Sequence, residues 1–430
     1  MVTTGRVPLL LLLGVVPVVL RPTLGTMWLW VLVVGLLVVA DWALAPSPGH
    51  LGLTRLPTPP VRTGQAGESV LLVENRSRRR VHALVRDAWQ PSAGAGRDRH
   101  RLRLRGRESL RVATVLLPRR RGDLHTHTLT VRTAGPLGLA ARQRTRDLPG
   151  TVRSLPPFDS RKHLPSRLAR LRDLDGRAAV RVRGQGTEFD SLREYVRGDD
   201  VRSIDWRASA RNRTVVVRTW QPERDRRLVL VLDTSRTSAG RVGDVPRLDS
   251  AMDAALLLAA LAARAGDRVD FIAGDRRVRS QVRAAGTRGV TATLQEAMAD
   301  LEPVIAEANW SALAGAVTAL GRQRALVVLL TPLEPSAVEE GLLPVLPVLT
   351  AHHRVVVASV KDPALEELAA RRTDLDAVYD AAAAEQVLLR RRHSAELLGA
   401  LGVHVLDVDA ESLPPTLADH YLSLKARGLL

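Results

Sequence analysis

Three oxygen-bearing side chains at alternate positions, Asp233, Ser235 and Thr237, directly follow the apolar run Leu228–Leu232. They offer one carboxylate and two hydroxyls from a single loop, and such hard oxygen donors suit Mg²⁺. The plainer interpretation is that Asp and Ser cap the turn that follows. If the apolar run is a buried parallel strand, the loop lies at its carboxyl end, where open α/β sheets bind their ligands. The pattern is interpreted as an incomplete candidate site for Mg²⁺.

A second group of ionisable residues lies in the stretch Gly186–Arg211, which carries six carboxylates and five arginines. Asp199, Asp200 and Asp205 include the pair of acids that glycoside hydrolysis requires. Arginine forks, however, bind carboxylates bidentately and hold them ionised, which opposes the raised pKa of a general acid. We therefore expect a charged joint between two domains, in which Trp206 supplies apolar surface to bury. An acid-dependent hydrolase using Gly198–Asp205 is the alternative.

The first part of this stretch predicts a short helix over Thr187–Arg197. Phe189, Leu192 and Val196 would share one face of such a helix. Gly198 follows as a C-terminal stop.

An α/β domain must position the Asp233 loop. After residue 225, continuous apolar runs alternate with long helical patterns rich in Ala and Leu. The predicted strands are Leu228–Asp233, Arg268–Ala273, Leu326–Thr331, Arg354–Val360 and Val403–Val408, and the predicted helices include Arg247–Ala265, Trp310–Leu320 and Ala377–Leu401. This alternation is typical of a parallel sheet covered on both faces, a doubly wound fold.

The region before it reads as all-β. Short alternating segments separated by turn residues predict a small β-sandwich. The predicted strands are Ser69–Glu74, Val81–Asp87, Arg101–Arg105, Leu110–Leu117 and His125–Thr133. The proline-rich segment Pro46–Pro60 is interpreted as a stiff linker, and a helix is expected around Ser166–Leu174.

Two apolar runs, Val7–Leu20 and Met27–Ala40, are separated by the polar break Arg21–Thr26. They predict a transmembrane helical hairpin, although the first run spans only about 21 Å as a helix. A cleavable signal peptide, or one span with an interfacial first segment, is the alternative. The arginines that follow the second run place both termini and the soluble domains in the cytoplasm.

The net charge of +18 is concentrated in one segment. Residues 51–183 hold 30 basic and 10 acidic groups, a balance of +20. Only Trp89 is available for base stacking between residues 51 and 150, so an anionic membrane surface explains this charge better than nucleic acid. A nucleic-acid-binding membrane protein stays a further alternative.

Cysteine is absent, which excludes disulfides and thiolate chemistry. No lysine follows a glycine, so there is no P-loop, and no other catalytic signature is found. The expected function is therefore non-enzymatic.

The run of residues around Asp199 resembles the signature of domain-of-unknown-function family 58. Its matching positions include Glu188, Phe189, Arg193, Tyr195, Gly198, Asp199, Asp200, Arg202, Asp205, Trp206 and Arg211, after Gly184 and Gly186. That family places a membrane hairpin and a β-rich region before the signature. After it comes a domain that resembles the von Willebrand factor type A domain with its metal-ion-dependent adhesion site.

The resemblance implies a binding or scaffold protein that works with a MoxR-type AAA+ ATPase, and it implies no catalytic activity. Asp233, Ser235 and Thr237 match the first loop of the adhesion site. Ser311 is the only hydroxyl where the second loop is expected, and Glu334 stands near the position of the third-loop Asp. The expected organisation is a transmembrane hairpin (1–50), a basic β-sandwich-like domain (51–150), a connector with the signature (151–225) and an A-type α/β domain (226–430).

Overall fold

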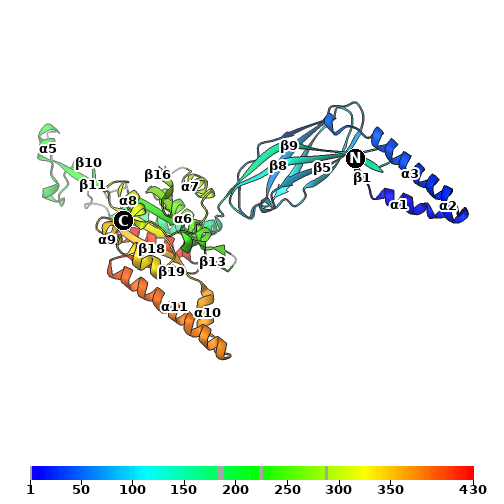
Figure 1. The fold of residues 1–430 in the computed structure, drawn as a ribbon. Coiled ribbons are helices and arrows are strands. Elements are labelled where there is room, and N and C mark those ends of the chain that lie inside the picture. The colour runs from blue at the N-terminus through cyan, green and yellow to red at the C-terminus, as the bar shows by residue number, and fades with distance from the viewer. Residues whose placement is uncertain (1, 182–187, 213, 222–225, 244, 286–288) are drawn as a thin grey trace. The chain divides into compact units, whose positions relative to one another are not determined.

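The computed structural model describes residues 2–181, 188–212, 214–221, 226–243, 245–285 and 289–430. Gly184, Gly186 and Thr187, which belong to the predicted signature and helix, lie outside the described residues. The chain forms two compact units, Met1–Leu155 and Pro156–Leu430 (Figure 1). Residues 151–155, expected in the connector, instead complete the last strand of the first unit.

The first unit begins with a short strand and three helices, β1 (Val2–Thr3), α1 (Arg6–Leu13), α2 (Val15–Leu20) and α3 (Leu24–Leu44). Trp30 of α3 donates from its indole Nε1 to the carbonyl oxygen of Leu10 in α1 at 3.1 Å. Among the described residues, the stretch Leu24–His50 is long and apolar enough to cross a membrane, whereas Arg6–Leu20 is shorter. An N-terminal helix of spanning length is therefore present, and a second crossing stays a prediction.

Two sheets packed face to face make up the rest of this unit. Their strands are β2 (Leu51–Arg55), β3 (Val61–Arg62), β4 (Gly67–Asn75), β5 (Val81–Trp89), β6 (Arg99–Leu104), β7 (Ser109–Leu116), β8 (Gly122–Ala134) and β9 (Ala140–Leu155). One sheet has the order β2-β4-β7, and the other the order β1-β9-β8-β5-β6 with β3 beside β9. Alternate side chains such as Leu71, Val73 and Val85 fill a shared core. The predicted strands are confirmed. Alternation of apolar and polar residues predicted them because each strand buries one of its two faces.

The predicted linker Pro46–Pro60 is wrong as a whole. It contains the 3₁₀ turn η1 (Pro48–His50) and strand β2, which pairs with β4. Leu51 is fully buried in the core between the two sheets. Burial of this apolar side chain outweighs the stiffening effect of the neighbouring prolines, which lie outside the strand.

The second unit is built on a mostly parallel sheet in the order β16-β15-β12-β17-β18-β19. Its strands are β12 (Arg227–Asp233), β15 (Arg268–Gly274), β16 (Val278–Ala285), β17 (Ala325–Leu330), β18 (Arg354–Val360) and β19 (His404–Val408). All but β16 run parallel, and β16 closes one edge as an antiparallel strand. The five predicted strands are confirmed to within two residues. From β12 the chain continues first to β15 on one side and later to β17 on the other. The order in which the chain connects the strands therefore reverses between β12 and β17.

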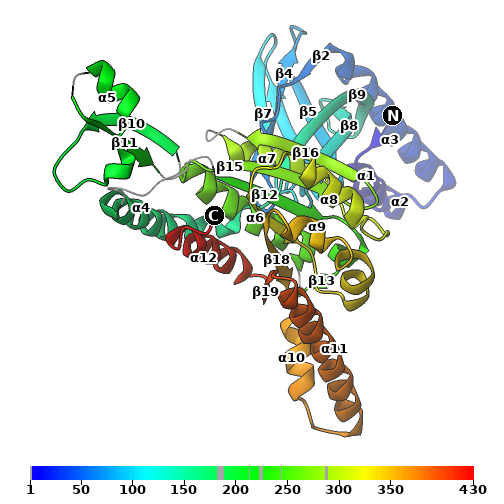
Figure 2. The ribbon, with the colours of Figure 1, turned by 90° about the vertical axis from the view of Figure 1, so that its left-hand side faces the viewer.

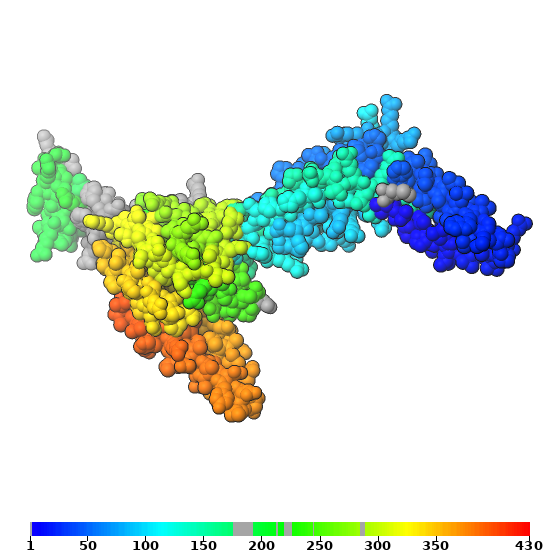
Figure 3. Space-filling model, viewed as in Figure 1, coloured from blue at the N-terminus to red at the C-terminus, as the bar shows by residue number. Residues whose placement is uncertain are grey.

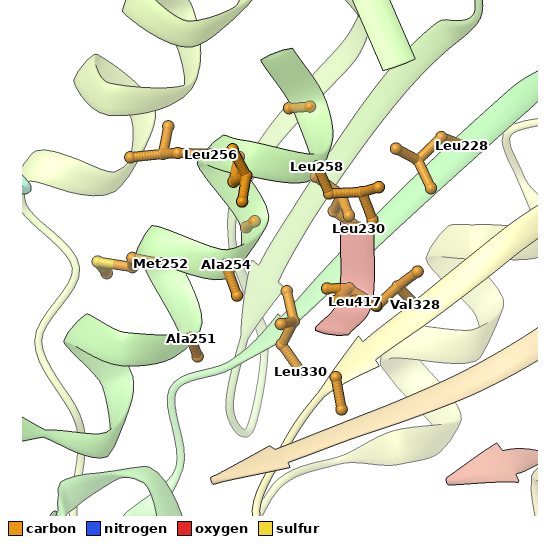
Figure 4. Close-up of a cluster of buried hydrophobic side chains, with 14 of the residues drawn as sticks. Leu228, Leu230, Ala251, Met252, Ala254, Leu256, Leu258, Val328, Leu330 and Leu417 are labelled. Atoms are coloured by element: carbon orange, nitrogen blue, oxygen red, sulfur yellow. The ribbon is translucent and has the colours of Figure 1, made fainter. Parts of the chain in front are cut away.

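Helices cover both faces of this sheet. One face carries α4 (Leu164–Arg181), α6 (Arg247–Arg264), α7 (Val290–Ala299) and α12 (Leu413–Ala426), and the other α8 (Trp310–Thr318), α9 (Leu346–Thr350) and the end of α11 (Leu375–Ala400). Figure 4 shows α6 laying Ala254 and Leu258 against Leu230 of β12 and Leu330 of β17. A helix buried along most of its length needs the Ala- and Leu-rich composition that predicted α6.

Several further elements are short or lie at the edge of the second unit. They are η2 (Pro91–Ala93) in the first unit, and η3 (Asp159–His163), η5 (Arg236–Ala239), β13 (Arg241–Val242), β14 (Val245–Pro246), the π-helical turn η6 (Ala337–Leu342) and α10 (Pro363–Ala370) in the second. α10 and α11 pack side by side and extend beyond the β19 edge of the sheet (Figure 2).

The signature region forms a hairpin, not the predicted helix. It consists of β10 (Glu188–Glu194), η4 (Val201–Ser203), α5 (Trp206–Asn212) and β11 (Val216–Gln221), with β10 antiparallel to β11. The helix Thr187–Arg197 was predicted from local spacing, but the backbone of β10 pairs with the β-branched residues of β11, which lie over twenty residues later. Leu192 and Val196, two residues of the predicted apolar helix face, are 39% and 61% exposed.

Candidate functional site

The candidate site lies where the sheet of the second unit reverses its order of connection. Asp233 is the last residue of β12, and Thr331 directly follows the neighbouring strand β17. On the other side of β12, Asp275 follows β15. Because parallel strands end at the same edge, these three residues lie at the carboxyl end of the sheet, in the place where open α/β folds bind ligands.

The carboxylate of Asp233 is held by neutral donors. The backbone N–H of Ser235 donates to Oδ1 at 2.8 Å, and the hydroxyls of Thr237 and Thr331 donate to Oδ2 at 3.0 and 2.7 Å. The Ser235 and Thr237 hydroxyls lie 3.0 Å apart. Asp233 and Ser235 are each 1% exposed. The three residues predicted from the sequence therefore do come together.

Burial raises the pKa of Asp233, and the hydrogen bonds from Ser235, Thr331 and Thr237 oppose this rise without cancelling it. The cause is that water is excluded while the hydrogen-bond donors within reach carry no charge. An ionised carboxylate in this position gains from any cation that approaches it. Burial therefore disfavours the charged form of Asp233 in the absence of a nearby cation.

A network of backbone and side-chain contacts holds this loop to its surroundings. The Thr234 hydroxyl donates to Asp275 at 2.9 Å, and the Arg236 guanidinium pairs with Glu307. The backbone N–H of Arg236 donates to the carbonyl of Ala306 at 2.9 Å. Next to this contact, Ile305 is 91% exposed. The polar loop is thus bonded to the segment around Ala306, beside an exposed apolar side chain.

The two other predicted ligands do not join the group. Ser311 is exposed on the first turn of α8, where it lines a groove of about 520 Å³ with Ala314, Gly315 and Val348. Glu334 is partly buried, and no hydrogen bond joins it to Asp233. Within the described residues, no cluster of three His, Asp or Glu side chains has the geometry of a metal site.

Sequence reasoning missed Thr331. In the sequence it is only the last residue of the predicted strand Leu326–Thr331, although its position one residue past β17 mirrors that of the loop after β12. The signal was available: a hydroxyl at the carboxyl end of a predicted parallel strand faces the same crevice as its neighbour.

Two acidic residues of the hairpin, Asp199 and Asp205, form ion pairs inside it. Arg193 binds Asp199 with both guanidinium arms at 2.6 and 2.8 Å. Arg218 binds Asp205, whose other oxygen accepts from the Ala208 N–H at 2.9 Å. These two pairings are made within the hairpin, and the charged joint between two domains stays a prediction.

These pairings lower the pKa of both carboxylates. For Asp199 the main cause is the hydrogen bond from Arg193, and for Asp205 it is the backbone N–H of Ala208 followed by Arg218. A lowered pKa opposes a general-acid role, which argues against the hydrolase alternative. Trp206 is 66% exposed, so the expectation that it is buried is wrong.

The other signature positions shape the turns. Gly198 has φ +113°, a conformation that favours glycine. The Asp200 carboxylate accepts from the Arg202 N–H at 2.9 Å and starts η4. The Tyr195 N–H donates to the Val215 carbonyl and extends the β10–β11 ladder. Arg211 is exposed near the end of α5. Glu188 and Phe189 are the first two residues of β10.

Comparison with known families gives one match of substantial length. The model of the family described as "Protein of unknown function DUF58" matches residues 191–396. The match begins in the β10–β11 hairpin and ends in α11, so it takes in the Asp233 loop and Thr331.

Individual relatives are distant. The chain is 25% identical over 119 residues to the "Uncharacterized protein YeaD" of Bacillus subtilis (strain 168). That alignment covers 28% of this chain and only 30% of the relative's length.

Similar solved structures match about a quarter of the chain. A PapD-like domain of human CEP192 shares 17% identity, with a TM-score of 0.20, over 26% of this chain and 89% of its own. The CARDB domain of the Pyrococcus furiosus PF1109 protein shares 13% identity, with a TM-score of 0.19, over 26% of this chain and 91% of its own. Scores of this size establish neither fold nor function.

Proposed function

We propose that this chain is a non-enzymatic, membrane-tethered binding protein that contacts a partner through the Asp233 loop, with a MoxR-type AAA+ ATPase as the candidate. The observation that carries the proposal is the buried Asp233 carboxylate, cupped by Ser235, Thr237 and Thr331 at the sheet's point of reversal. Every group bonded to it is a neutral donor. This arrangement suits binding of a positively charged group, and it does not provide an acid and a base for catalysis.

A von Willebrand factor type A-like fold for the second unit is supported by the strand order, which is that of a doubly wound sheet, and by the D-x-S-x-T loop at the end of β12. The domain's function would then be adhesion-like. The identity of the partner rests on the family resemblance alone.

The donor set fits weak binding of Mg²⁺. A hydroxyl that donates its proton to Asp233 keeps oxygen lone pairs free, so the hydroxyls of Ser235 and Thr237 can hold a cation beside the carboxylate. The ion would supply positive charge for a carboxylate of the partner. A single protein carboxylate provides little charge, so we expect low affinity until the partner completes the set of ligands.

Membrane tethering is supported by the way in which the N-terminal helices are fastened. β1 pairs with β9 at Ala140 and Ala141, and the backbone N–H groups of Leu137, Leu139 and Ala140 donate to Asp41 near the end of α3. Both ends of the helical segment are thus held at one edge of the same sheet. A segment that leaves and returns at one place suits a hairpin with both ends on the cytoplasmic side.

Replacing Asp233 by Asn should weaken capture of the ATPase more than tenfold while the protein stays folded. Asn keeps the shape and one acceptor oxygen but removes the charge, and a charge-assisted contact contributes about 1.5–3 kcal/mol. Full-length protein in lipid nanodiscs would be titrated with a purified MoxR-type ATPase. Asp419→Asn, which removes a charge from the α12 surface where Asp419 pairs with Arg167 and Arg170, is the control.

Metal dependence is tested without the ATPase, which needs Mg²⁺ for its own nucleotide. Water-proton relaxation should detect Mn²⁺ on the wild-type chain at millimolar concentration and not on Asp233→Asn. If the variant no longer captures the ATPase while no ion binds either protein, the Asp233 loop is a metal-free contact surface. Undiminished capture by Asp233→Asn would place the partner elsewhere and refute the proposal.

The orientation can be tested with single cysteines, because the chain contains none. A Cys at Pro22, between α2 and α3, should react with a membrane-impermeant maleimide in intact cells. A Cys at Asp409, in the second unit, should react only after lysis, as expected for cytoplasmic domains. Labelling at Asp409 in intact cells would reverse the orientation. Protection at both positions would show that α2 does not reach the outer surface.

A further inference from the structure

The arm formed by α10 and α11 carries an apolar stripe that its own unit leaves uncovered. The inner face of α11 is buried, through Ala377, Ala381, Ala384, Arg391 and Leu398. On the opposite face, Leu375, Tyr379 and Leu389 are 71%, 70% and 60% exposed. The arm projects from the rest of the second unit in Figure 3, and these exposed fractions mean that the described part of its unit leaves the stripe uncovered.

The stripe has the spacing of a helix–helix seam. With 100° per residue, one line along α11 contains residues at alternating steps of four and three: Leu375, Tyr379, Ala382, Gln386, Leu389 and His393. The buried residues of α11 lie on the opposite side of the helix. Seams of this kind pack against another helix, and three heptads with two polar members suit a weak, reversible contact.

The order of residues along the seam selects the occupant. We propose that the outward face of α11 pairs with α11 of a second copy of this chain, antiparallel and centred on position 384. In that register Tyr379 faces Leu389, Ala382 faces Gln386, and Leu375 faces His393. Each pair places a bulky or apolar residue against one that can cover it, and a two-fold axis makes every contact twice.

Charge supports the same arrangement. The first half of α11 is acidic on its exposed surface, with Asp376, Asp380 and Glu385, and the second half is basic, with Arg390 and Arg392. Asp376 and Arg390 flank the seam on the same side. An antiparallel pair brings each Asp376 beside the other copy's Arg390, so charges of opposite sign meet at both ends of the contact.

This inference goes beyond the proposed function, because it concerns a surface on the α10–α11 arm and not the Asp233 loop. Two copies held in one membrane are confined at high local concentration, so modest affinity per contact is sufficient. Its failure would leave the proposal for the Asp233 loop intact, and the tests use different variants.

Single cysteines distinguish the antiparallel register from its alternatives. Full-length Tyr379→Cys and Leu389→Cys proteins, with tags of different mass, would be mixed in detergent, reconstituted together and oxidised. A disulfide needs Cα atoms closer than about 7 Å, and within one helix these positions are about 15 Å apart. We expect the mixed disulfide several-fold above either homodimer, since the symmetry-related Tyr379–Leu389 contact stays intact.

The control is a mixture of Val387→Cys with Tyr379→Cys, because Val387 is 41% exposed but lies off the seam. In a second measurement, Leu389→Glu should convert the full-length dimer to monomer by light scattering, whereas Val387→Glu should leave it unchanged. Homodimeric disulfides at Tyr379 would indicate parallel pairing and refute the proposal. A mixed yield no higher than the control, or a dimer that survives Leu389→Glu, would also refute it.

Discussion

Replacing Arg55 by Met is expected to destabilise the first unit by about 3–5 kcal/mol, because it leaves a buried carboxylate without its counter-charge. The Asp87 side chain has no exposed surface, and Arg55 is 6% exposed. Two guanidinium nitrogens of Arg55 donate to Asp87 at 2.7 and 3.0 Å. The indole N–H of Trp89 donates to the same carboxylate at 2.9 Å. Without Arg55, neutral donors alone would surround the charge.

The measurement is hydrogen exchange of the β4 and β5 amides in the full-length protein, which reports opening of the first unit by itself. Arg86→Met is the matched control, since the Arg86–Asp98 pair is solvent-exposed and should contribute less than about 1 kcal/mol. The double variant Arg55→Met/Asp87→Leu should recover much of the loss, because it removes both charges. Unchanged exchange in Arg55→Met would show that the pair does not matter for stability.

Arg391→Met should release the base of the α10–α11 arm at a cost of about 3 kcal/mol. Arg391 is buried, although it projects from a helix whose other face is in solvent. Its Nη2 donates to Asp407 of β19 at 2.7 Å and to Ser359 of β18 at 3.2 Å, and its Nε donates to Asp407 at 3.3 Å. The guanidinium therefore joins α11 to two neighbouring strands, and Met can replace only its packing.

Faster exchange in the second half of α11 and in β19, with β12 unaffected, is the expected result. Arg391→Lys should be nearly as harmful, since an ammonium group cannot make the forked contact. Arg372→Met is the control, because the Arg372–Glu385 pair lies in solvent on the same arm. If β12 loosens equally in Arg391→Met, the arginine supports the whole sheet and not only the arm.

The α/β fold could be predicted because its signals are local and strong. The strands β12, β17 and β18 are almost entirely buried, so their sequences contain unbroken apolar runs that no exposed segment tolerates. The apolar α3 and the alternation in β4 and β5 are signals of the same kind. Asp233, Ser235 and Thr237 were found because they occupy one loop after such a strand.

The contacts that could not be predicted join residues distant in the sequence. Arg55 was counted among the charges that set membrane orientation, yet it is buried against Asp87. Asp41 directly follows the apolar run Met27–Ala40 and has no visible role in the sequence, yet its three amide donors lie almost a hundred residues away. A charged residue looks the same in the sequence whether its side chain lies in solvent or pairs with a buried partner, because only the fold determines its surroundings.

The sequence by itself determined the class of each unit, the apolar α3 and the loop that carries Asp233, since burial on a strand or helix leaves a periodic record in neighbouring residues. Only the tertiary structure decided that β10 is a strand and that Thr331 completes the cup around Asp233. The pairing of β10 with β11 and the approach of β17 to β12 depend on segments far apart in the chain. Their free energy comes from contacts that no local window of sequence contains.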